Sequence, residues 1–436
     1  MPAVSTGSAV ACAIACAPAP IKGKAGSGGF TFAAGRPTQA SDGLSGKGTV
    51  PKATFMGFRR AGGGVGVRNR LLVLSILGLT TPAARRVARS LPGSLLVAAP
   101  HGRGQLGEDA AAYRRQMIGL GRNPNIGAVL VIGADRTRVD LIADGIAGGG
   151  ALVESVALDD VHEDALALTD RGIRAGARLM HAISRLRREP VPLASLLVGI
   201  ECGHSDATSG LVANPLVGAV TDRLVDAGAS VMVGETLEWL GGEHVLAARA
   251  RTAAVGEAIT AAVLRREKAA AATGVDLTGN NPGQENIRGG LSTIEEKSLG
   301  AIAKAGSRPI AGLLALAERP KEPGLYLMDA PAFSPESLTG FAAAGAQLMM
   351  FTTGPGNSFV NAVAPTLKVS GHAETPSRLP EQIDFDAGAV LAGRETLDAA
   401  ADRLLALLVD VASGSATWGE VLDEGDEVMA RLGQSF

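Results

Sequence analysis

Hydrophobic positions between residues 71 and 187 gather in short runs that alternate with stretches of apolar residues at helical spacing. Unbroken apolar runs are typical of strands buried on both faces, and a repeat of three to four residues is typical of amphipathic helices. The pattern predicts strands over residues 71–77, 94–98, 126–132 and 152–157, and helices over 82–90, 108–120, 136–146 and 162–187. This alternation indicates a parallel sheet covered by helices on both faces.

The second half of the chain repeats the alternation after a break at Glu189-Pro190-Val191-Pro192. The pattern predicts strands over 193–200, 230–233, 325–328, 347–351 and 367–370, and helices over 216–227, 236–240, 251–271, 335–344, 395–412 and 418–432. We therefore expect an α/β protein with two parallel-sheet domains, over residues 53–189 and 190–436. In open sheets of this kind, ligands bind in loops at strand ends and helix N-termini. Residues 1–52 lack sustained periodicity and are interpreted as a disordered tail or a misassigned start, with a transit peptide as the alternative.

The composition of the chain disfavours nucleic acids and membranes as binding partners. The net charge is −2 and aromatic residues make up 3% of the chain, which disfavours nucleic-acid binding. No apolar run reaches the length of a membrane span, so no membrane partner is expected. The three cysteines, Cys12, Cys16 and Cys202, cannot form a disulfide scaffold. They indicate a reducing compartment, and we expect a cytoplasmic protein.

The polar stretch 201–210, ECGHSDATSG, stands between an expected strand and an expected helix. Asn214 is a suitable N-cap and Pro215 suits the first helical position. Free backbone N–H groups and the helix dipole at such a place favour an anion, such as a small carboxylate. The alternative is that the serine, threonine and aspartate side chains only close a loop.

Three further polar loops follow strands or precede helices: residues 101–105, 279–290 and 352–358. His101 is either a metal ligand or acid/base group, or a loop hydrogen-bonding residue. The amides and Arg288 of the second loop suit hydroxyl and carboxylate groups. Ser292 and Glu295 have the spacing of a capping box, so a helix is expected to start there. Lys297 on that helix either faces solvent or reaches back toward the loop.

A glycine-rich run at residues 62–66 precedes a strand instead of following it, so it does not have the context of a dinucleotide-binding fingerprint. The loop at 352–358 lacks the Gly-Lys-Ser/Thr ending of a P-loop, which disfavours nucleotide binding. Arg68 and Asn69 lie at the entrance of the first strand, where topology alone places them at the edge opposite the other loops.

Four motifs in this order resemble the altronate/galactarate dehydratase family of sugar-acid hydro-lyases. They are GVGVRN at 64–69, ECGHSD at 201–206 with ANP at 213–215, TIEEKSLG at 293–300, and FTTG at 351–354. The resemblance extends from about Phe55 to the C-terminus and likens the two expected domains to the second and C-terminal domains of the family. It implies elimination of water from an aldonate or aldarate to give a 2-keto-3-deoxy acid, assisted by a divalent metal, iron or manganese.

The chain also departs from that family. Relatives commonly carry cysteines in loops that here read Leu77-Gly78-Leu79, Arg103 and Ala134-Asp135. If those thiols bind iron in relatives, only Cys202 is left here. Oxygen and nitrogen ligands such as His101, Asp135 and His204 would then replace thiolates, or the metal is absent. His204 also stands where the family motif often has glycine.

The small N-terminal domain of the family is not recognisable in residues 1–52, and in two-subunit relatives such as sulfolactate sulfo-lyase it is a separate chain. A β-elimination of sulfite from a small hydroxy-carboxylate, with a separate small subunit, is therefore the second hypothesis. A non-catalytic sugar-acid binder is the third. A homo-oligomer is compatible with all three.

The resulting hypothesis is a lyase that acts on a small hydroxy-carboxylate. The catalytic candidates are His101, His204, Asp206 and Lys297. The candidate substrate contacts are Arg68, Asn69, Ser205, Asn280, Arg288, Thr352 and Thr353. The candidate metal ligands are Cys202 and His101.

Overall fold

The computed structural model describes residues 54–102, 104–274 and 281–431, and it has the expected α/β architecture, with two large parallel sheets among these residues. Residues 1–53, which include the expected tail, Cys12 and Cys16, lie outside the described residues. The division into domains at residue 189 remains a prediction.

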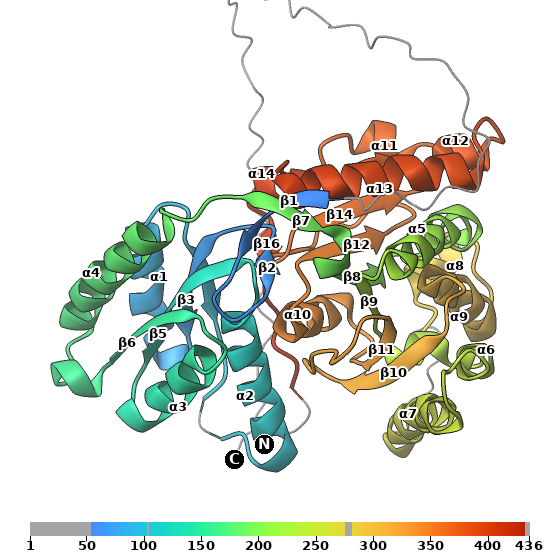
Figure 1. Cartoon of the computed structure of the whole chain (residues 1–436). Coiled ribbons are helices and arrows are strands. Elements are labelled where there is room, and N and C mark those ends of the chain that lie inside the picture. The colour runs from blue at the N-terminus through green and yellow to red at the C-terminus, as the bar shows by residue number, and fades with distance from the viewer. Residues whose placement is uncertain (1–53, 103, 275–280, 432–436) are drawn as a thin grey trace, which may run out of the picture. The chain divides into compact units, whose positions relative to one another are not determined.

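The first parallel sheet has the strand order β4-β3-β5-β6, and β3, β5 and β6 are labelled in Figure 1. Its strands are β3 (Arg70–Ser75), β4 (Leu95–Ala98), β5 (Ile126–Gly133) and β6 (Leu152–Ala157). Side chains alternate between its faces because successive residues of a strand point in opposite directions. Leu71 and Val73 pack with helices α1 (Thr81–Arg89) and α4 (Ala165–Ile183), whereas Leu72 and Leu74 pack with α2 (Gly107–Gly121) and α3 (Arg136–Ala147).

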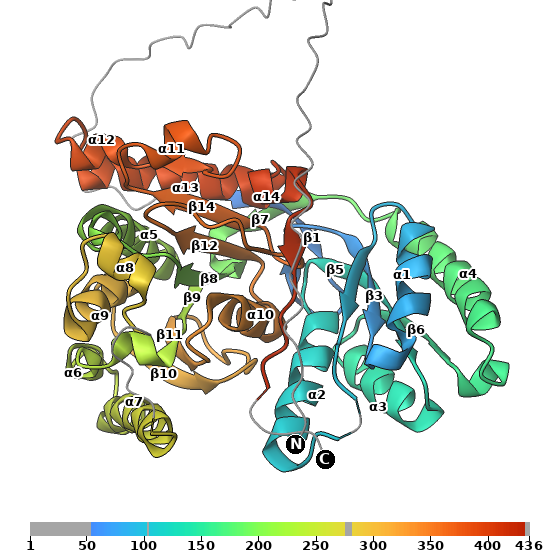
Figure 2. The ribbon, with the colours of Figure 1, turned by 180° about the vertical axis from the view of Figure 1, so that it is seen from behind.

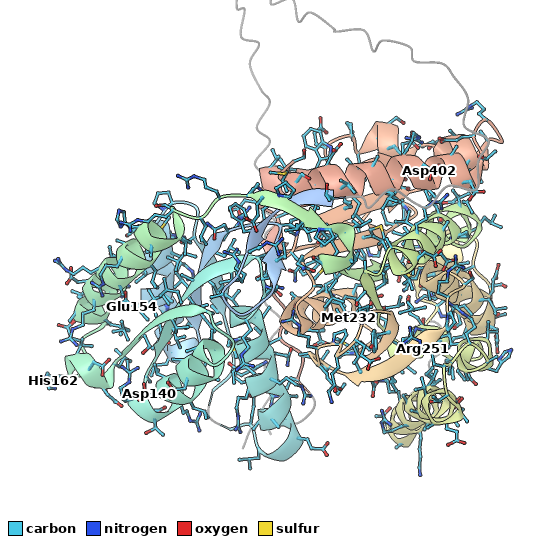
Figure 3. The ribbon with its side chains drawn as sticks, in the orientation of Figure 1. Asp140, Glu154, His162, Met232, Arg251 and Asp402 are labelled. Atoms are coloured by element: carbon cyan, nitrogen blue, oxygen red, sulfur yellow. The ribbon has the colours of Figure 1, made fainter. Side chains whose placement is uncertain are left out.

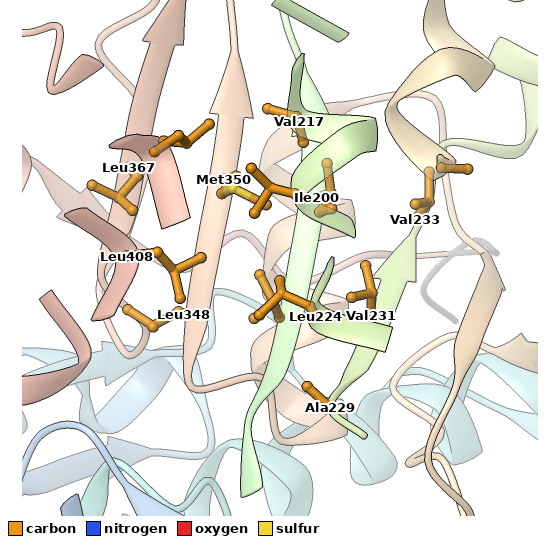
Figure 4. Packing of buried hydrophobic residues seen from close by; sticks show 14 of the residues in the cluster. Ile200, Val217, Leu224, Ala229, Val231, Val233, Leu348, Met350, Leu367 and Leu408 are labelled. Atoms are coloured by element: carbon orange, nitrogen blue, oxygen red, sulfur yellow. The ribbon is translucent and has the colours of Figure 1, made fainter. Parts of the chain in front are cut away.

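The second parallel sheet has the order β10-β11-β9-β8-β12-β14-β15 among the described residues. Its strands are β8 (Leu197–Cys202), β9 (Ser230–Val233), β10 (Ile310–Ala315), β11 (Leu325–Asp329), β12 (Leu348–Thr352), β14 (Thr366–Ser370) and β15 (Phe385–Asp386). Ile200, Val231 and Met350 project toward α5 (Asn214–Asp226), as Figure 4 shows. The same core includes residues of α7 (Ala253–Ala272) and α13 (Leu397–Ser413). The opposite face packs against α10 (Ser334–Ala344).

Shorter elements complete the described chain. β1 (Thr54–Arg59) pairs antiparallel with β2 (Val65–Gly66) and β7 (Glu189–Pro192), and β13 (Val360–Asn361) pairs with β16 (Gly425–Asp426). The short helices are α6 (Glu243–Ala247), α8 (Gln284–Arg288), α9 (Ile294–Ile302), α11 (Thr375–Arg378), α12 (Gly388–Leu391) and α14 (Trp418–Val421). Figure 2 shows α11, α12 and α13 together on one side of the second sheet.

The two sheets share one hydrophobic core. Met117 and Leu120 of α2 belong to the same buried cluster as Phe341 of α10 and Met232 of β9. α2 and α10 lie side by side in both ribbon views (Figures 1 and 2). Charged side chains such as Asp140 and Asp402 lie on the outside, whereas Met232 is enclosed (Figure 3).

Buried amide side chains connect the two sheets beside this core. Asn125 Nδ2 donates to the backbone oxygens of Gln347 and Val363. Asn125 Oδ1 accepts from the backbone N–H groups of Val67 and Arg68. Gln347 Nε2 in turn donates to the backbone oxygens of Val65 and Ser195. These amides fix the segment before β3 against the start of β12.

Several expected element boundaries are wrong. The expected helix at 418–432 is confined to α14, because the chain then pairs as β16. The segment 236–240 forms a 3-10 turn, Thr236–Trp239. Thr293, not Ser292, caps α9, accepting from Glu296 N, while Glu296 accepts from Ser292 N and Oγ.

By length and hydropathy alone, one stretch of the described residues, Leu397–Val421, would pass as a membrane span. Its helix α13 packs on α5 and β1 through Leu404, Leu408 and Val411. A core helix of a globular protein meets the same criteria, so this stretch gives little support to a membrane location.

We expect Asn125→Ala to lower the free energy of unfolding by about 3 kcal/mol, because several buried backbone groups would lose their partner. Urea denaturation followed by circular dichroism measures the change. Arg85→Ala, at an exposed position of α1, is the control and is expected to change stability by less than about 0.5 kcal/mol. A loss below about 1 kcal/mol for Asn125→Ala would mean that the amide connection contributes little.

Candidate active site

The strand order of the second sheet places a crevice beside β8. The chain passes from β8 to β9 on one side and later returns to β12 on the other side. The loops that leave β8 and β12 therefore diverge, and ligands bind at such switch points in open α/β sheets. Asp206 of the first loop lies against Gly354 of the second: a Cβ built on Gly354 would come within 2.1 Å of Asp206 Cγ.

A cavity of about 510 Å³ lies at this crevice. Loops that follow β8, β9, β11 and β12 contribute to it, together with α8 and α9. Its polar lining residues are Cys202, His204, Ser205, Glu235, Glu238, Asn281, Glu285, Asn286, Lys297, Ser334 and Asn357.

A buried ammonium group lies next to Cys202 and Glu238 of the cavity lining. Lys304 is 0% exposed, and its Nζ lies 2.7 Å from Glu238 Oε2 and 3.1 Å from Glu201 Oε2. A third contact, also of 3.1 Å, joins Nζ to Cys202 Sγ. An ammonium has three N–H donors, and three acceptors surround this one. The site therefore has a fixed positive charge with no exposure to solvent.

Three carboxyl groups gather around Lys304. One oxygen each of Glu201, Glu235 and Glu238 lies within 4.8 Å of the others. Glu201 Oε1 also accepts from Ser337 Oγ of α10. Lys297 Nζ approaches Glu238 Oε1 at 3.7 Å from the cavity side. Glu238 is thus held between two ammonium groups.

The carboxyl groups differ in their affinity for protons. Burial opposes ionisation of Glu238, but the positive charges of Lys304 and Lys297 outweigh burial and lower its pKa. Burial raises the pKa of Glu235 well above its ordinary value, and the negative charges of Glu238 and Glu201 add to this effect. Burial also raises the pKa of Glu201, to about 7, against the attraction of Lys304. The pKa values of the neighbouring carboxyl groups Glu235 and Glu238 are therefore shifted in opposite directions.

Glu235 lies directly behind β9 in the left-handed region, with φ of 59°. The side chain is 4% exposed, and its Oε1 has no hydrogen-bond partner among the described residues. Glu235 also lines the cavity. A buried polar atom without a partner costs free energy, so Oε1 is suited to meet a ligand or a water molecule.

Lys297, Asn281 and Ser205 form a polar wall of the cavity. Lys297 Nζ donates to Asn281 Oδ1 at 2.6 Å. Ser205 Oγ is buried without a hydrogen-bond partner among the described residues, and its backbone oxygen accepts from Asn286 Nδ2. An ammonium, an amide and a free hydroxyl together suit a carboxylate or a polyhydroxy chain.

His204 is placed at the cavity by a left-handed backbone, with φ of 52°. Its Nδ1 lies 3.0 Å from the backbone oxygen of Gly356. Since a carbonyl oxygen can only accept, Nδ1 carries the proton of this bond. Nε2 is therefore the nitrogen that can exchange a proton with a ligand.

Family models match nearly the whole described chain. The model of D-galactarate/altronate dehydratase, C-terminal, matches residues 193–435, and that of D-galactarate dehydratase/altronate hydrolase, second domain, matches residues 57–184. The chain belongs to the D-galactarate/altronate dehydratase family.

Individual relatives in this family carry different names. The chain is 38% identical to the (2R)-sulfolactate sulfo-lyase subunit beta of Chromohalobacter salexigens, over 88% of this chain and 98% of that protein. It is 32% identical to the altronate dehydratase of Escherichia coli, over 83% of this chain and 74% of that protein. It is 29% identical to the galactarate dehydratase (L-threo-forming) of Escherichia coli, over 84% of this chain and 75% of that protein. These relatives are lyases, and the family resemblance expected from the motifs is confirmed.

The predicted catalytic residues are only partly brought together. His204 and Lys297 line the cavity, whereas His101 follows β4 of the first sheet and does not line it. Asp206 caps the helix behind it: its Oδ1 accepts from Ser209 N and Thr208 Oγ1. The catalytic roles of these residues remain predictions.

The helix after the family motif begins earlier than expected. Helical structure starts at Ala207 and includes a π-helical segment, Ser209–Ala213, before α5. Asn214 is therefore inside the helix and is not its N-cap. Its side chain accepts from Thr352 Oγ1 and donates to the backbone oxygen of Gly300. The N-cap prediction failed because a π-helical turn has no clear sequence pattern.

Among the predicted substrate contacts, Ser205 lines the cavity. Thr353 accepts from Gly356 N, and Thr352 bonds to Asn214. Arg288 is exposed at the end of α8 and does not line the cavity, and Asn280 lies outside the described residues.

Arg68 and Asn69 have structural partners away from the cavity lining. The Arg68 guanidinium pairs with Glu420 and donates to the backbone oxygens of Val411 and Ser415. Asn69 Nδ2 donates to the backbone oxygen of Ile183. Their predicted role as substrate contacts remains a prediction, and these contacts do not favour it.

The sequence patterns did not indicate Glu235, Glu238 and Lys304. Glu235 and Glu238 follow an expected strand, and this position alone could have indicated them. Lys304 lies in the sequence Ile302-Ala303-Lys304-Ala305, where a lysine among apolar residues is only a weak sign of burial.

A divalent metal does not fit between Glu201 and Glu238. The Lys304 ammonium already lies at hydrogen-bond distance from both carboxylates, and a metal would need oxygens at about 2.0–2.2 Å in the same space. Of the other suggested ligands, Asp135 accepts from Arg138 N as the N-cap of α3. The predicted set of His101, Asp135 and His204 does not line one cavity among the described residues.

We expect Cys202 to be an inert thiol in the folded protein. Burial, together with the charge of Glu238, raises its pKa to about 12, and the residue is 1% exposed. In a variant with Cys12→Ser and Cys16→Ser, reaction with a thiol reagent at pH 8 should be at least ~100-fold slower in the folded than in the unfolded chain. Free cysteine under the same conditions is the control. Similar rates in both states would contradict this assignment.

Proposed function

We propose that the chain is the large subunit of a two-subunit lyase that removes a β substituent from a small 2-hydroxy-carboxylate, with sulfite as the leaving group and sulfolactate as the substrate. The main support for the lyase proposal is the cavity at the switch point. The floor of this cavity is Glu238, which is held between Lys297 and Lys304. The choice of sulfite is supported by the match to 98% of the sulfo-lyase subunit beta, against about three quarters of the dehydratases.

The reaction is a β-elimination. A base removes the proton from C2 of sulfolactate, the C2–H electron pair forms the C2=C3 bond, and the C3–S bond breaks. Its electron pair leaves with sulfite. The resulting enol takes up a proton at C3, loses the proton of its C2 hydroxyl group and gives pyruvate. For dehydration of a sugar acid, hydroxide leaves from C3 instead and must be protonated as it departs.

Lys297 is proposed to bind the substrate carboxylate together with Asn281 and Ser205. In the transition state, negative charge develops on this carboxylate as the C2 proton is removed, and a nearby ammonium stabilises the charge. Glu238 is proposed as the base. It is the carboxyl group of the cluster that is both in contact with two ammonium groups and part of the cavity lining.

His204 is proposed to assist the leaving group through Nε2, because Nδ1 is engaged by Gly356. A protonated imidazole at this place offers a hydrogen bond and a positive charge to departing sulfite. For departing hydroxide, it would be the proton donor. The same cavity therefore accommodates the chemistry of both named activities of the family.

The partner is proposed to be a small subunit, since the sulfo-lyase relative is named as a subunit beta. The reaction is proposed to take place in the cytoplasm, which the use of cysteine supports.

The test is to incubate the purified chain with (2R)-sulfolactate, altronate or galactarate, alone and with a candidate small subunit. Sulfite and pyruvate in equal amounts from sulfolactate are the expected products. A 2-keto-3-deoxy acid from altronate or galactarate without sulfite would select the dehydratase alternative. No turnover of any substrate, with binding retained, would leave the non-catalytic binder.

We expect Lys297→Met to lower kcat/KM by about 10³-fold, because the variant loses the positive charge at the developing enolate. Steady-state kinetics on the substrate identified above measures this. Lys321→Met makes the same change at an exposed lysine and should leave kcat/KM unaltered. Comparable activity of both variants would exclude Lys297 from the chemistry.

A further inference from the structure

The position of Lys304 resembles that of a bound cation. Its Nζ lies among oxygens of Glu201 and Glu238 and the sulfur of Cys202, at 2.7–3.1 Å. The lysine is fully buried, so these groups replace all of its hydration. The lysine follows α9 in a 3-10 turn, Ala303–Ala305, and its backbone oxygen accepts from Thr221 Oγ1. Both ends of the residue are therefore fixed.

The carboxyl groups around Lys304 are those that could otherwise hold a metal. Glu201, Glu235 and Glu238 are the group of potential ligands found among the described residues. Ammonium and metal cannot occupy the space between Glu201 and Glu238 together, because like charges at such distances repel strongly in a buried site. The ammonium is covalently attached to the chain and is therefore always present.

Charge balance gives the same result. Two ammonium groups already face the carboxyl cluster: Lys304 Nζ lies 3.1 Å from Glu201 and 2.7 Å from Glu238, and Lys297 Nζ lies 3.7 Å from Glu238 on the cavity side. A divalent ion at the cluster would therefore meet two positive charges at close range.

We propose that Lys304 is the built-in cation of the Glu201–Glu235–Glu238 cluster, in the place of a divalent metal. Its role is to position the Glu238 carboxylate toward the cavity. The positioning role of Lys304 rests on the proposed function, in which Glu238 is the base. Lys304 is a positioning residue, since it contacts Glu238 and does not line the cavity.

The substitution that tests this proposal is Lys304→Met, which keeps most of the side-chain volume and removes the charge. Without the ammonium, the three carboxyl groups become a site of hard oxygen ligands, which suits Mn²⁺. The variant is therefore expected to gain a binding site for Mn²⁺ that the wild-type chain lacks.

Binding of Mn²⁺ to the full chain is measured by electron paramagnetic resonance of the free ion, without substrate. Wild type and Lys321→Met, the exposed control, should show no specific site. Lys304→Met should bind one Mn²⁺ at least tenfold more tightly than wild type, and Lys304→Met combined with Glu238→Gln should lose that site. If the role of Lys304 were purely structural, Lys304→Met would not produce the broadened signal of bound Mn²⁺.

Two results would overturn the proposal. One is that the wild-type chain binds one Mn²⁺ and that Glu238→Gln abolishes this binding. This measurement does not depend on the folding of the lysine variant. The other is a folded Lys304→Met variant with no gain in Mn²⁺ binding.

Turnover is measured separately, with the substrate identified for the wild type. Lys304→Met should lose at least 100-fold in kcat with a smaller change in KM, and Mn²⁺ should restore part of kcat. Unchanged kcat in a folded variant would overturn the positioning role. If the wild type shows no turnover, the proposed function fails while the Mn²⁺ measurements still decide the nature of the cation.

Discussion

The arrangement of the candidate active site depends on the burial of one charged group. An ammonium without exposure is tolerated only when other charges and hydrogen bonds replace its hydration. Lys304 meets this requirement through residues from the end of β8 and the turn after β9. Ser337 of α10 then holds Glu201 from the other side. The position of one lysine therefore couples the strand ends that form the cavity floor.

The same buried charges shift the pKa values of neighbouring carboxyl groups in opposite directions. Glu238 contacts two ammonium groups, whereas Glu235 has burial and two negative neighbours around it. Pairs of titratable groups with opposed pKa shifts are typical of acid–base sites. Structural ion pairs can produce such shifts as well. Here the cavity, the lyase family of the chain and the Glu235 oxygen that has no hydrogen-bond partner among the described residues together favour a catalytic setting.

The sequence predicted much of the fold because buried parallel strands produce unbroken apolar runs. The strands at 152–157 and 230–233 have the bounds that the pattern indicates. Local patterns failed where distant contacts decide the structure. The π-helical turn before Asn214 and the pairing of β16 are two such places.

The candidate site was predictable only as a set of loops. The loops around residues 204, 281 and 353 do meet, because they leave neighbouring strands or approach them from adjacent helices. Lys304 was not predictable from its neighbours, since its partners are 66 and 103 positions away in the chain. His101 is the opposite case, because its loop belongs to the other sheet and does not line the cavity.

The hydrophobic core common to both sheets has a consequence for how the molecule comes apart. Met117, Met232 and Phe341 belong to one cluster, so neither sheet can expose its inner face without exposing that of the other. The buried amides of Asn125 and Gln347 cross the same boundary. Partial unfolding at this boundary would combine the loss of apolar contacts with unpaired backbone groups. The two halves, although distinct in sequence, are therefore expected to unfold together.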